Sequence, residues 1–473
     1  MNLEHHFSKL GDMFSSKTIV QPLLEQRLVE FNQSLATFLS IDIKSAQTKR
    51  FLSGEERLPN SLSMVYAGHQ FGGFSPQLGD GRGVLLGEVR GHDGLLYDLH
   101  MKGAGPTPYS RRGDGRAVLR SCIREYLASE AMSALSIPTS RALALYDSRE
   151  AVYREQPEAG AMLLRVAQGH IRFGHFEYFF YQGKQEQLDE LIDYCLEYYY
   201  PDCLATDSPL ENMLKEVVKR TARMIAKWQS VGFQHGVMNT DNFSFTGETI
   251  DYGPYGFMED YEPDWVCNHS DHEGRYAFSR QPGVGLWNLN CLMRCFSKHL
   301  ERNQLIAILQ CYEVELQTHY DSLMMKKLGF NSSQDVHELL PSLFTILGNE
   351  KMDYSVFFRL LSHFKRDAFN LLLDEVVDRE SLLNWLERYQ VARGASDFDW
   401  QETSHSMLQT NPKFILRNYL AHDAILAAEQ GDYLPFRRLL NVLSHPFDEH
   451  PESSMLAQRA PEWGKSLEVS CSS

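Results

Sequence analysis

Apolar residues recur at two different spacings along the chain, and the spacing changes near residue 180. Before that point, short apolar runs bounded by turn residues predict strands at 84–90, 95–102, 142–146 and 162–167. The turn Gly91-His-Asp-Gly94 joins the first two runs and predicts a β-hairpin. A spacing of three and four residues predicts one helix in this part of the chain, at 116–135, which Ile137-Pro138 closes.

Helical spacing dominates after residue 180. A helix is expected at 212–229, where one side is apolar, and Gly232 is expected to end it in the left-handed conformation. Further helices are expected at 286–300, 304–316, 354–364 and 414–428. We therefore predict an α+β, protein-kinase-like fold of two lobes, in which an N-terminal extension (1–60) precedes a β-rich lobe (61–180), a helical lobe (181–330) and a helical C-terminal extension (331–473).

The composition is that of a globular protein, with 473 residues of which 43% are hydrophobic and 23% charged. The 46 lysines and arginines against 62 aspartates and glutamates give a net charge of −16, which argues against nucleic acid as a partner. No apolar stretch is long enough to span a membrane, and the N-terminus lacks a basic leader. Eight cysteines are few for this length and favour a reducing compartment, so we expect a cytoplasmic protein without a membrane partner, and a monomer.

Candidate chemistry begins just after Gly232. The segment contains His235 and Asn242, and Asp251-Tyr-Gly253 follows nine residues after Asn242. A carboxamide and a carboxylate on neighbouring loops offer hard oxygen ligands to Mg²⁺ or Mn²⁺, the ions that bridge nucleotide phosphates. Asx hydrogen bonds in turns are the alternative role for this pair of residues.

The order of five residues is similar to that in protein kinases. Kinases place a strand lysine, a helix glutamate, a histidine, a metal-binding asparagine and an Asp-aromatic-Gly in sequence. The corresponding residues here are Lys102, Glu125, His235, Asn242 and Asp251. This order predicts a nucleotide site.

Glu125 and Glu130 compete to hold Lys102. Five helical positions separate the two glutamates by about 140°, so only one of them can point at Lys102. We select Glu125 because it falls on the same stripe of the helix as Cys122, Ser129 and Met132.

One position departs from the kinase pattern. Kinases carry an aspartate two residues after the histidine to accept the proton of the substrate hydroxyl, and this chain has Val237 there. Valine cannot act as a base, which weakens conventional γ-phosphoryl transfer and leaves a catalytically dead pseudokinase as an alternative. Asp241, next to Asn242, remains as a candidate base, with a supporting role at the metal or in capping as its alternative.

Longer motifs carry a more specific resemblance. The runs YAGHQFGGFSPQLGDGRG, DLHMKGAGPTPYSRRGDGRAVLRSCIREYL, LLRVAQGHIRFGHFEYF and HGVMNTDNFSFTGETIDYGPYGFMEDY, with the Cys-Ser-Ser ending, closely resemble the selenoprotein O (SelO) family of kinase-like protein adenylyltransferases. These motifs cover most of residues 60–300, while the C-terminal helices carry less of the signature.

The resemblance implies that ATP binds in an orientation inverted relative to kinases, so that AMP is transferred to Ser, Thr or Tyr hydroxyls of proteins. Similar family members also use UTP and transfer UMP, with His as a further acceptor. Asn242 and Asp251 would hold Mg²⁺ or Mn²⁺, and Asp241 would accept the proton. The implied nucleotide contacts are Gly79, Gly81, Arg82, Lys102, Asp114, Gly115, Arg165, Arg172 and Asp251.

The residue types at these positions suit that role. Glycines let backbone N–H groups approach phosphate oxygens. Arg82, Arg165 and Arg172 can form forked hydrogen bonds to a terminal phosphate, which an inverted triphosphate would use as an anchor.

Two cysteines suggest regulation. Cys471 lies three residues from the end of the sequence, where eukaryotic relatives resemble it with selenocysteine, and Cys267 follows the Asp251 motif in the region that corresponds to a kinase activation segment. A reversible disulfide between Cys267 and Cys471 would tether the tail over the site, and two unpaired thiols are the alternative. Cys291 and Cys295 have a metal-like spacing but are expected to be part of a helix core.

Overall fold

An eight-stranded antiparallel sheet dominates the N-terminal part of the computed structural model, which describes residues 2–363, 370–394 and 400–470. Its main path runs β1-β3-β6-β7-β10-β9-β2, and β8 pairs with β10. The strands are β1 (Ser15–Lys17), β2 (Arg27–Phe31), β3 (Leu62–Met64), β6 (Gly83–Arg90), β7 (Leu96–Lys102), β8 (Ala117–Val118), β9 (Arg141–Tyr153) and β10 (Pro157–Ala167).

All four predicted strands are present. β6 and β7 form the predicted hairpin, and Gly94 in its turn has a φ of +79°. β9 and β10 extend well beyond the predicted apolar runs. Residues 1–60, predicted as an extension, supply both ends of the path, β1 and β2, together with α1 (Gln33–Phe38) and α2 (Ala46–Leu52).

Helix α3 (Leu119–Ala134) packs against β9 and β10 and carries Glu125. The helix was predicted to begin at residue 116, but residues 117 and 118 pair with β10 as β8. Nearly all of its side chains are buried, because other helices cover the face that the sheet leaves free.

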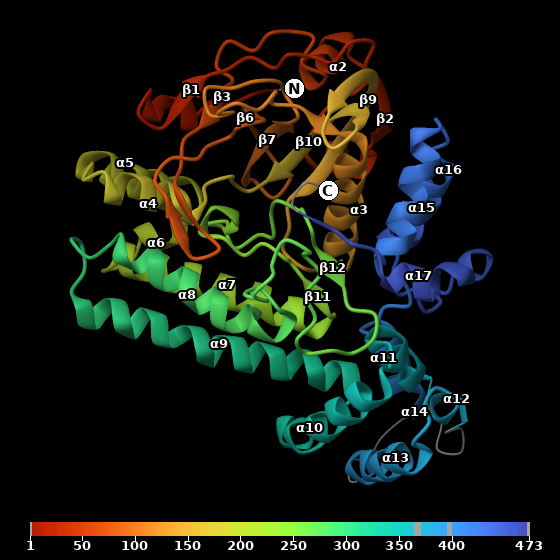
Figure 1. Ribbon diagram of the computed structural model, residues 1–473. Coiled ribbons are helices and arrows are strands. Elements are labelled where there is room, and N and C mark those ends of the chain that lie inside the picture. The colour runs from red at the N-terminus through yellow and green to blue at the C-terminus, as the bar shows by residue number, and fades with distance from the viewer. Residues whose placement is uncertain (1, 364–369, 395–399, 471–473) are drawn as a thin grey trace.

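Helices make up most of the rest of the chain (Figure 1). The predicted helix at 212–229 is α7 (Pro209–Ser230), and Gly232 follows it with a φ of +71°. The other helices up to residue 330 are α4 (Phe173–Tyr181), α5 (Gln185–Tyr198), α6 (Pro201–Leu204), α8 (Gln281–Arg294) and α9 (Arg302–Leu328). None of the helices in the described ranges combines the length and apolarity that crossing a bilayer requires.

The C-terminal helices divide into two groups. The first group lies beside the C-terminal end of α9 and has its own apolar core; its members are α10 (Ser333–Glu350), α11 (Tyr354–Ser362), α12 (Asn370–Leu373), α13 (Arg379–Gly394) and α14 (Trp400–Leu408). In the second group, α15 (Asn418–Glu429) and α16 (Leu434–Ser444) return to pack on α3, as Figure 1 shows, and α17 (Glu462–Lys465) follows.

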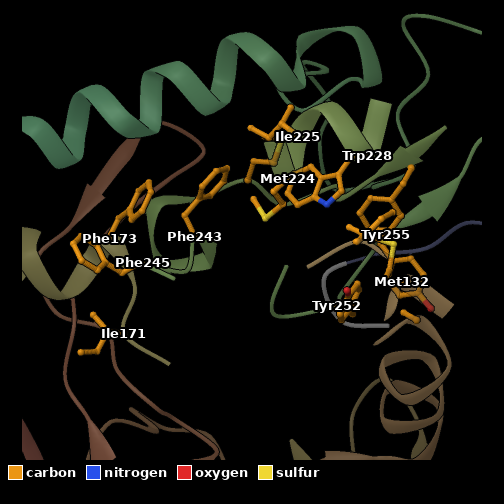
Figure 2. Close-up of a cluster of buried hydrophobic side chains, with 14 of the residues drawn as sticks. Met132, Ile171, Phe173, Met224, Ile225, Trp228, Phe243, Phe245, Tyr252 and Tyr255 are labelled. Carbon is orange, nitrogen blue, oxygen red and sulfur yellow. The ribbon is translucent and has the colours of Figure 1, made fainter. Parts of the chain in front are cut away.

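The largest hydrophobic core joins the sheet to the helices. In Figure 2, Met132 of α3 and Trp228 of α7 belong to this core together with Phe243 and Tyr252. Phe243 directly follows Asn242 and Tyr252 directly follows Asp251, so buried aromatic rings hold both loops in place. The indole of Trp228 also donates a hydrogen bond to Thr249 Oγ1 over 2.9 Å, two residues before Asp251.

Candidate active site

One cavity of about 700 Å³ gathers the residues that the sequence singled out for nucleotide and metal. It lies between the edge of the sheet and the loops that follow α7. Its walls include Gly79, Gly81, Arg82, Lys102, Asp114, Gly115, Arg165, Arg172, Asp241, Asn242 and Asp251. Residues from two strands, β7 and β10, and from several loops thus converge, although 172 positions separate Gly79 from Asp251 in the sequence.

Lys102, at the end of β7, and Glu125, on α3, form a buried ion pair. Glu125 also accepts a hydrogen bond from Arg165 Nη1 over 3.2 Å. Burial favours the neutral acid, but Lys102 and Arg165 outweigh it and hold the pKa of Glu125 below its usual value. Glu130 points elsewhere and pairs with Arg141 over 2.6 Å, so Glu125, and not Glu130, is the partner of Lys102.

Asp251 lies between two arginines. Arg165 Nη1 donates to its Oδ1 over 2.7 Å, and Arg172 Nη1 hydrogen-bonds to its Oδ2. Burial alone would raise the pKa of Asp251, but the two guanidinium groups lower it far below its ordinary value. The backbone of Asp251 is left-handed, with a φ of +58°. The carboxylate is therefore ionised and held by cations that could also bind phosphate.

His100 and Asp80 lie behind Arg165, and the sequence did not point to either of them. Arg165 Nη2 donates to His100 Nδ1 over 2.9 Å, which leaves the ring proton on Nε2, facing Asp80 Oδ2 at 3.2 Å. Burial lowers the pKa of His100 despite the attraction of Asp80. His100 could have been predicted, because it lies two residues before Lys102 on a strand and so shares its face.

Asp241 is buried beside the cavity, in the short turn η2 (Thr240–Asn242). Its Oδ2 accepts a hydrogen bond from Gln70 Nε2 over 3.1 Å, while its buried Oδ1 has no hydrogen-bond partner among the described residues. A Cβ on Gly68 would lie 2.4 Å from this Oδ1, so only glycine fits there. Burial raises the pKa of Asp241 to about 6. The sequence carried no signal for Gln70, which lies 171 positions away.

The side-chain amide of Asn242 is held by one hydrogen bond. Its Nδ2 donates to the Val237 carbonyl over 3.0 Å, which fixes the amide and leaves Oδ1 as the remaining ligand atom. The Asp251 side chain keeps about 26% of its surface exposed, so it stays accessible from the cavity. An amide oxygen and a carboxylate form a hard donor set that fits Mg²⁺ or Mn²⁺.

The two glycine-rich loops form the outer wall of the cavity. Gly79 and Gly115 have φ values of +139° and +68°, and a Cβ on Gly115 would lie 2.0 Å from the Gly105 carbonyl oxygen. Asp114 pairs with Arg154, a residue that the sequence reasoning did not select, over 2.8 Å. Arg82 is exposed and makes no ion pair among the described residues.

Cys267 is buried just below the site, where its thiol donates to the Pro254 carbonyl over 2.8 Å. The next residue, Asn268, pairs in parallel with Val469 of the tail, and the His269 N–H donates to Val469 O over 2.9 Å. Cys471 lies outside the described residues. Cys291 in α8 and Cys295, which directly follows that helix, are both buried, as expected for a helix core.

The cavity thus combines paired cations, an ionised aspartate, an amide and a buried carboxyl whose pKa is raised. This set of groups is typical of an enzyme that acts on phosphate esters. The model of the family described as protein adenylyltransferase SelO matches residues 1–444 of the chain. The chain therefore belongs to the SelO family, and it is an enzyme of the nucleotidyltransferase class.

Related proteins from single organisms match this chain along almost their whole length. The chain is 85% identical over 473 residues to the protein nucleotidyltransferase YdiU of Marinomonas sp. (strain MWYL1), with both chains covered completely. It is 47% identical to the proteins of that name from Pseudoalteromonas atlantica and Vibrio cholerae, with all of this chain and 100% and 99% of theirs covered.

Proposed function

We propose that this enzyme transfers AMP from ATP, and UMP from UTP, to side chains of other proteins. Serine, threonine and tyrosine hydroxyls are the proposed acceptors, with histidine added for UMP. The family membership and the names of the relatives support nucleotidyl transfer onto protein. We also propose a kinase-like, two-lobed fold and a monomer that works in the cytoplasm; the sheet and the helices on either side of the cavity support the fold.

The observation that carries the proposal is the distribution of cations in the cavity. Lys102, Arg165 and Arg172 are almost fully buried, whereas Arg82 on the glycine-rich loop is exposed. The terminal phosphates, which carry most of the charge of a triphosphate, are most stable against buried forked donors. A nucleotide anchored in this way has its γ-phosphate inside and its base toward the exposed loops, which is the inverted orientation.

Asn242 and Asp251 are the proposed ligands of Mg²⁺ or Mn²⁺. When bound, such an ion would supply positive charge that stabilises the α-phosphoryl group and the departing pyrophosphate. Arg165 and Arg172 both bind the Asp251 carboxylate. We propose that both guanidinium groups turn to the γ-phosphate when the nucleotide enters, which frees the Asp251 oxygens.

Asp241 is the proposed base. Its carboxyl lies in the cavity wall, where Gln70 holds Oδ2 and Oδ1 has no hydrogen-bond partner among the described residues. We propose that this carboxyl turns toward the cavity to accept the proton of an acceptor hydroxyl. The hydroxyl oxygen then attacks the α-phosphorus, the bond to the β-phosphate oxygen breaks, and pyrophosphate leaves. Val237, which replaces the kinase base, takes no part in this scheme.

We propose that a Cys267–Cys471 disulfide regulates the enzyme. Val469 pairs with Asn268 and precedes Cys471 by two residues, which supports a tail that reaches Cys267. Non-reduced digests of oxidised protein should contain a peptide that joins both cysteines. Two unlinked thiols after oxidation would contradict this part of the proposal.

Labelled nucleotides test the function. With a mixture of protein acceptors, label should be retained on protein from α-labelled ATP and not from γ-labelled ATP. Asp241→Asn should lower the rate by roughly 10²–10⁴-fold while nucleotide binding persists, because the general base is lost. Label from γ-labelled ATP alone would indicate a kinase, and nucleotide binding without any labelled product would indicate a pseudokinase.

A further inference from the structure

A small hairpin stands beside the proposed base. Strands β4 (Gly68–Gln70) and β5 (Gly73–Ser75) pair only with each other and form a sheet apart from the main one. Gln70 and Phe71 line the same cavity as Asp241. The hairpin therefore borders the place where an acceptor hydroxyl must arrive.

The hairpin is fixed to the two residues that precede Asp241. The His69 N–H donates to Thr240 Oγ1 over 2.7 Å, and the Phe71 N–H donates to Asn239 Oδ1 over 3.0 Å. His69 Nδ1 also lies 2.6 Å from the buried carboxylate of Glu177. These bonds give the hairpin a defined position relative to the base.

Aromatic rings on this hairpin remain exposed to solvent. Phe71 is 42% exposed and Phe74 is 37% exposed. Tyr181, at the end of α4, is 43% exposed and lies against Phe74 with ring centroids 4.4 Å apart. A group of exposed rings next to a cavity is typical of a surface that binds another molecule.

A cation without an acidic partner completes this surface. The guanidinium of Arg275 stacks on the Trp287 ring at 4.7 Å and lies against the hairpin turn, where a Cβ on Gly72 would be 3.3 Å from it. No described carboxylate pairs with Arg275, and its buried Nε has no hydrogen-bond partner in the described part of the chain. The nearby Asp271 carboxylate accepts from the backbone N–H of Arg275 and of Tyr276 instead.

A bound molecule with an acidic group would supply the opposite charge. The chain has an excess of 16 acidic over basic charges, yet none of its described carboxylates pairs with this arginine. An arginine held flat by a tryptophan loses little freedom when it binds a carboxylate. A peptide that places its hydroxyl at Asp241 would cross the aromatic rings and this guanidinium.

We propose that the hairpin surface, made of Phe71, Phe74, Tyr181, Arg275 and Trp287, binds the acceptor segment of the protein substrate. It selects segments that carry an apolar side chain and an acidic side chain close to the modified hydroxyl. This inference rests on the proposed function and adds the substrate class to it.

A peptide array tests the selection. Each peptide carries one serine, threonine or tyrosine, an adjacent phenylalanine, and either glutamate or lysine at the flanking positions. With α-labelled ATP, the wild-type enzyme should label the glutamate peptides about fivefold or more above the lysine peptides. Arg275→Glu should reverse this preference. Arg57→Glu, the same charge change at an exposed loop residue, should keep the wild-type preference.

The preference is the ratio of glutamate-peptide to lysine-peptide labelling within one enzyme preparation. A variant that is partly unfolded labels both sets less, but this ratio stays valid. Phe74→Ala provides a second test and should raise the KM for phenylalanine-containing peptides about fivefold while the KM for ATP stays the same. Equal labelling of both peptide sets by the wild-type enzyme, or an unchanged preference in Arg275→Glu, would overturn the inference alone. An array that takes label only from γ-labelled ATP, or none at all, would overturn the proposed function and this inference with it.

Discussion

At the scale of single residues, the site is a balance of buried charges. Lys102, Arg165 and Arg172 share two carboxylates, Glu125 and Asp251, so the cluster has one more cation than anions. The acids keep the cations in place, and the surplus charge favours a polyanion. Removing one of these two acids should therefore weaken nucleotide binding more than the same charge change elsewhere on the protein would.

Glu125→Gln tests this balance. We expect the KM for ATP to rise and kcat/KM to fall at least about tenfold, because Lys102 loses the group that orients it. Glu125→Asp should restore part of the activity. Glu130→Gln is the matched control on the same helix; it breaks the pair with Arg141 and should leave the KM for ATP unchanged. Equal effects of the two glutamine variants on this KM would contradict the assignment.

Local patterns predicted some site residues and left others hidden. Lys102, Glu125, Asn242 and Asp251 were found because each occupies a fixed place in a short motif. Gln70 and Asp80 were missed because their partners, Asp241 and His100, come from other elements. Such contacts arise only when the chain has folded.

At the scale of elements, the presence of a helix could be predicted from the sequence, but the residues at which it begins and ends could not. The helix predicted at 304–316 extends from Arg302 to Leu328 as α9. Its apolar spacing fades after Leu316, but Met324 and Leu328 are buried in the second core, against α10–α14. The helix predicted at 286–300 lies at 281–294 as α8, with Pro282 in its first turn, where proline needs no donor.

Lys327 near the end of α9 allows a prediction about stability. Its side chain is buried over the rings of Tyr354 and Phe358, and no described carboxylate pairs with it. Burial lowers its pKa from 10.5 to about 7. Between these two values the unfolded chain carries the proton and the folded chain does not, so the free energy of unfolding should rise with pH across this window.

Lys327→Met should remove this dependence. Below pH 7 the lysine is charged in both states and its burial cost is fully present, so the variant should be more stable there by roughly 1–4 kcal/mol. The difference should shrink as pH approaches 10. Urea unfolding at several pH values measures it, with the exposed Lys326→Met as control. A variant that is less stable than the wild type at pH 6.5 would contradict the prediction.

At the scale of the whole molecule, helices α15 and α16 support the sheet from outside. The ring of Phe436 on α16 meets Tyr126 of α3 edge-on, with centroids 5.7 Å apart. Arg437 reaches Glu30 of β2 over 3.0 Å. The sequence predicted helices in this region but not their return to α3, because no local pattern encodes a contact across 300 residues.

Phe436→Ala should show what this return contributes. Phe436 is fully buried, so its truncation should lower the free energy of unfolding by about 3–5 kcal/mol. Leu434→Ala, two residues earlier and 71% exposed, should change it by less than about 0.5 kcal/mol. Urea titration followed by tryptophan fluorescence compares the two. Similar decreases in the free energy of unfolding in both variants would mean that α16 does not stabilise the protein through its buried face.

The orientation of the nucleotide is the central claim, and a crystal structure with a non-hydrolysable ATP analogue and Mg²⁺ tests it most directly. We expect the γ-phosphate against Lys102, Arg165 and Arg172, the α-phosphate beside Asn242 and Asp251, and the base near the exposed glycine-rich loops. The account would be contradicted by an adenine base buried beside Lys102, Arg165 and Arg172, with the γ-phosphate at the mouth of the cavity.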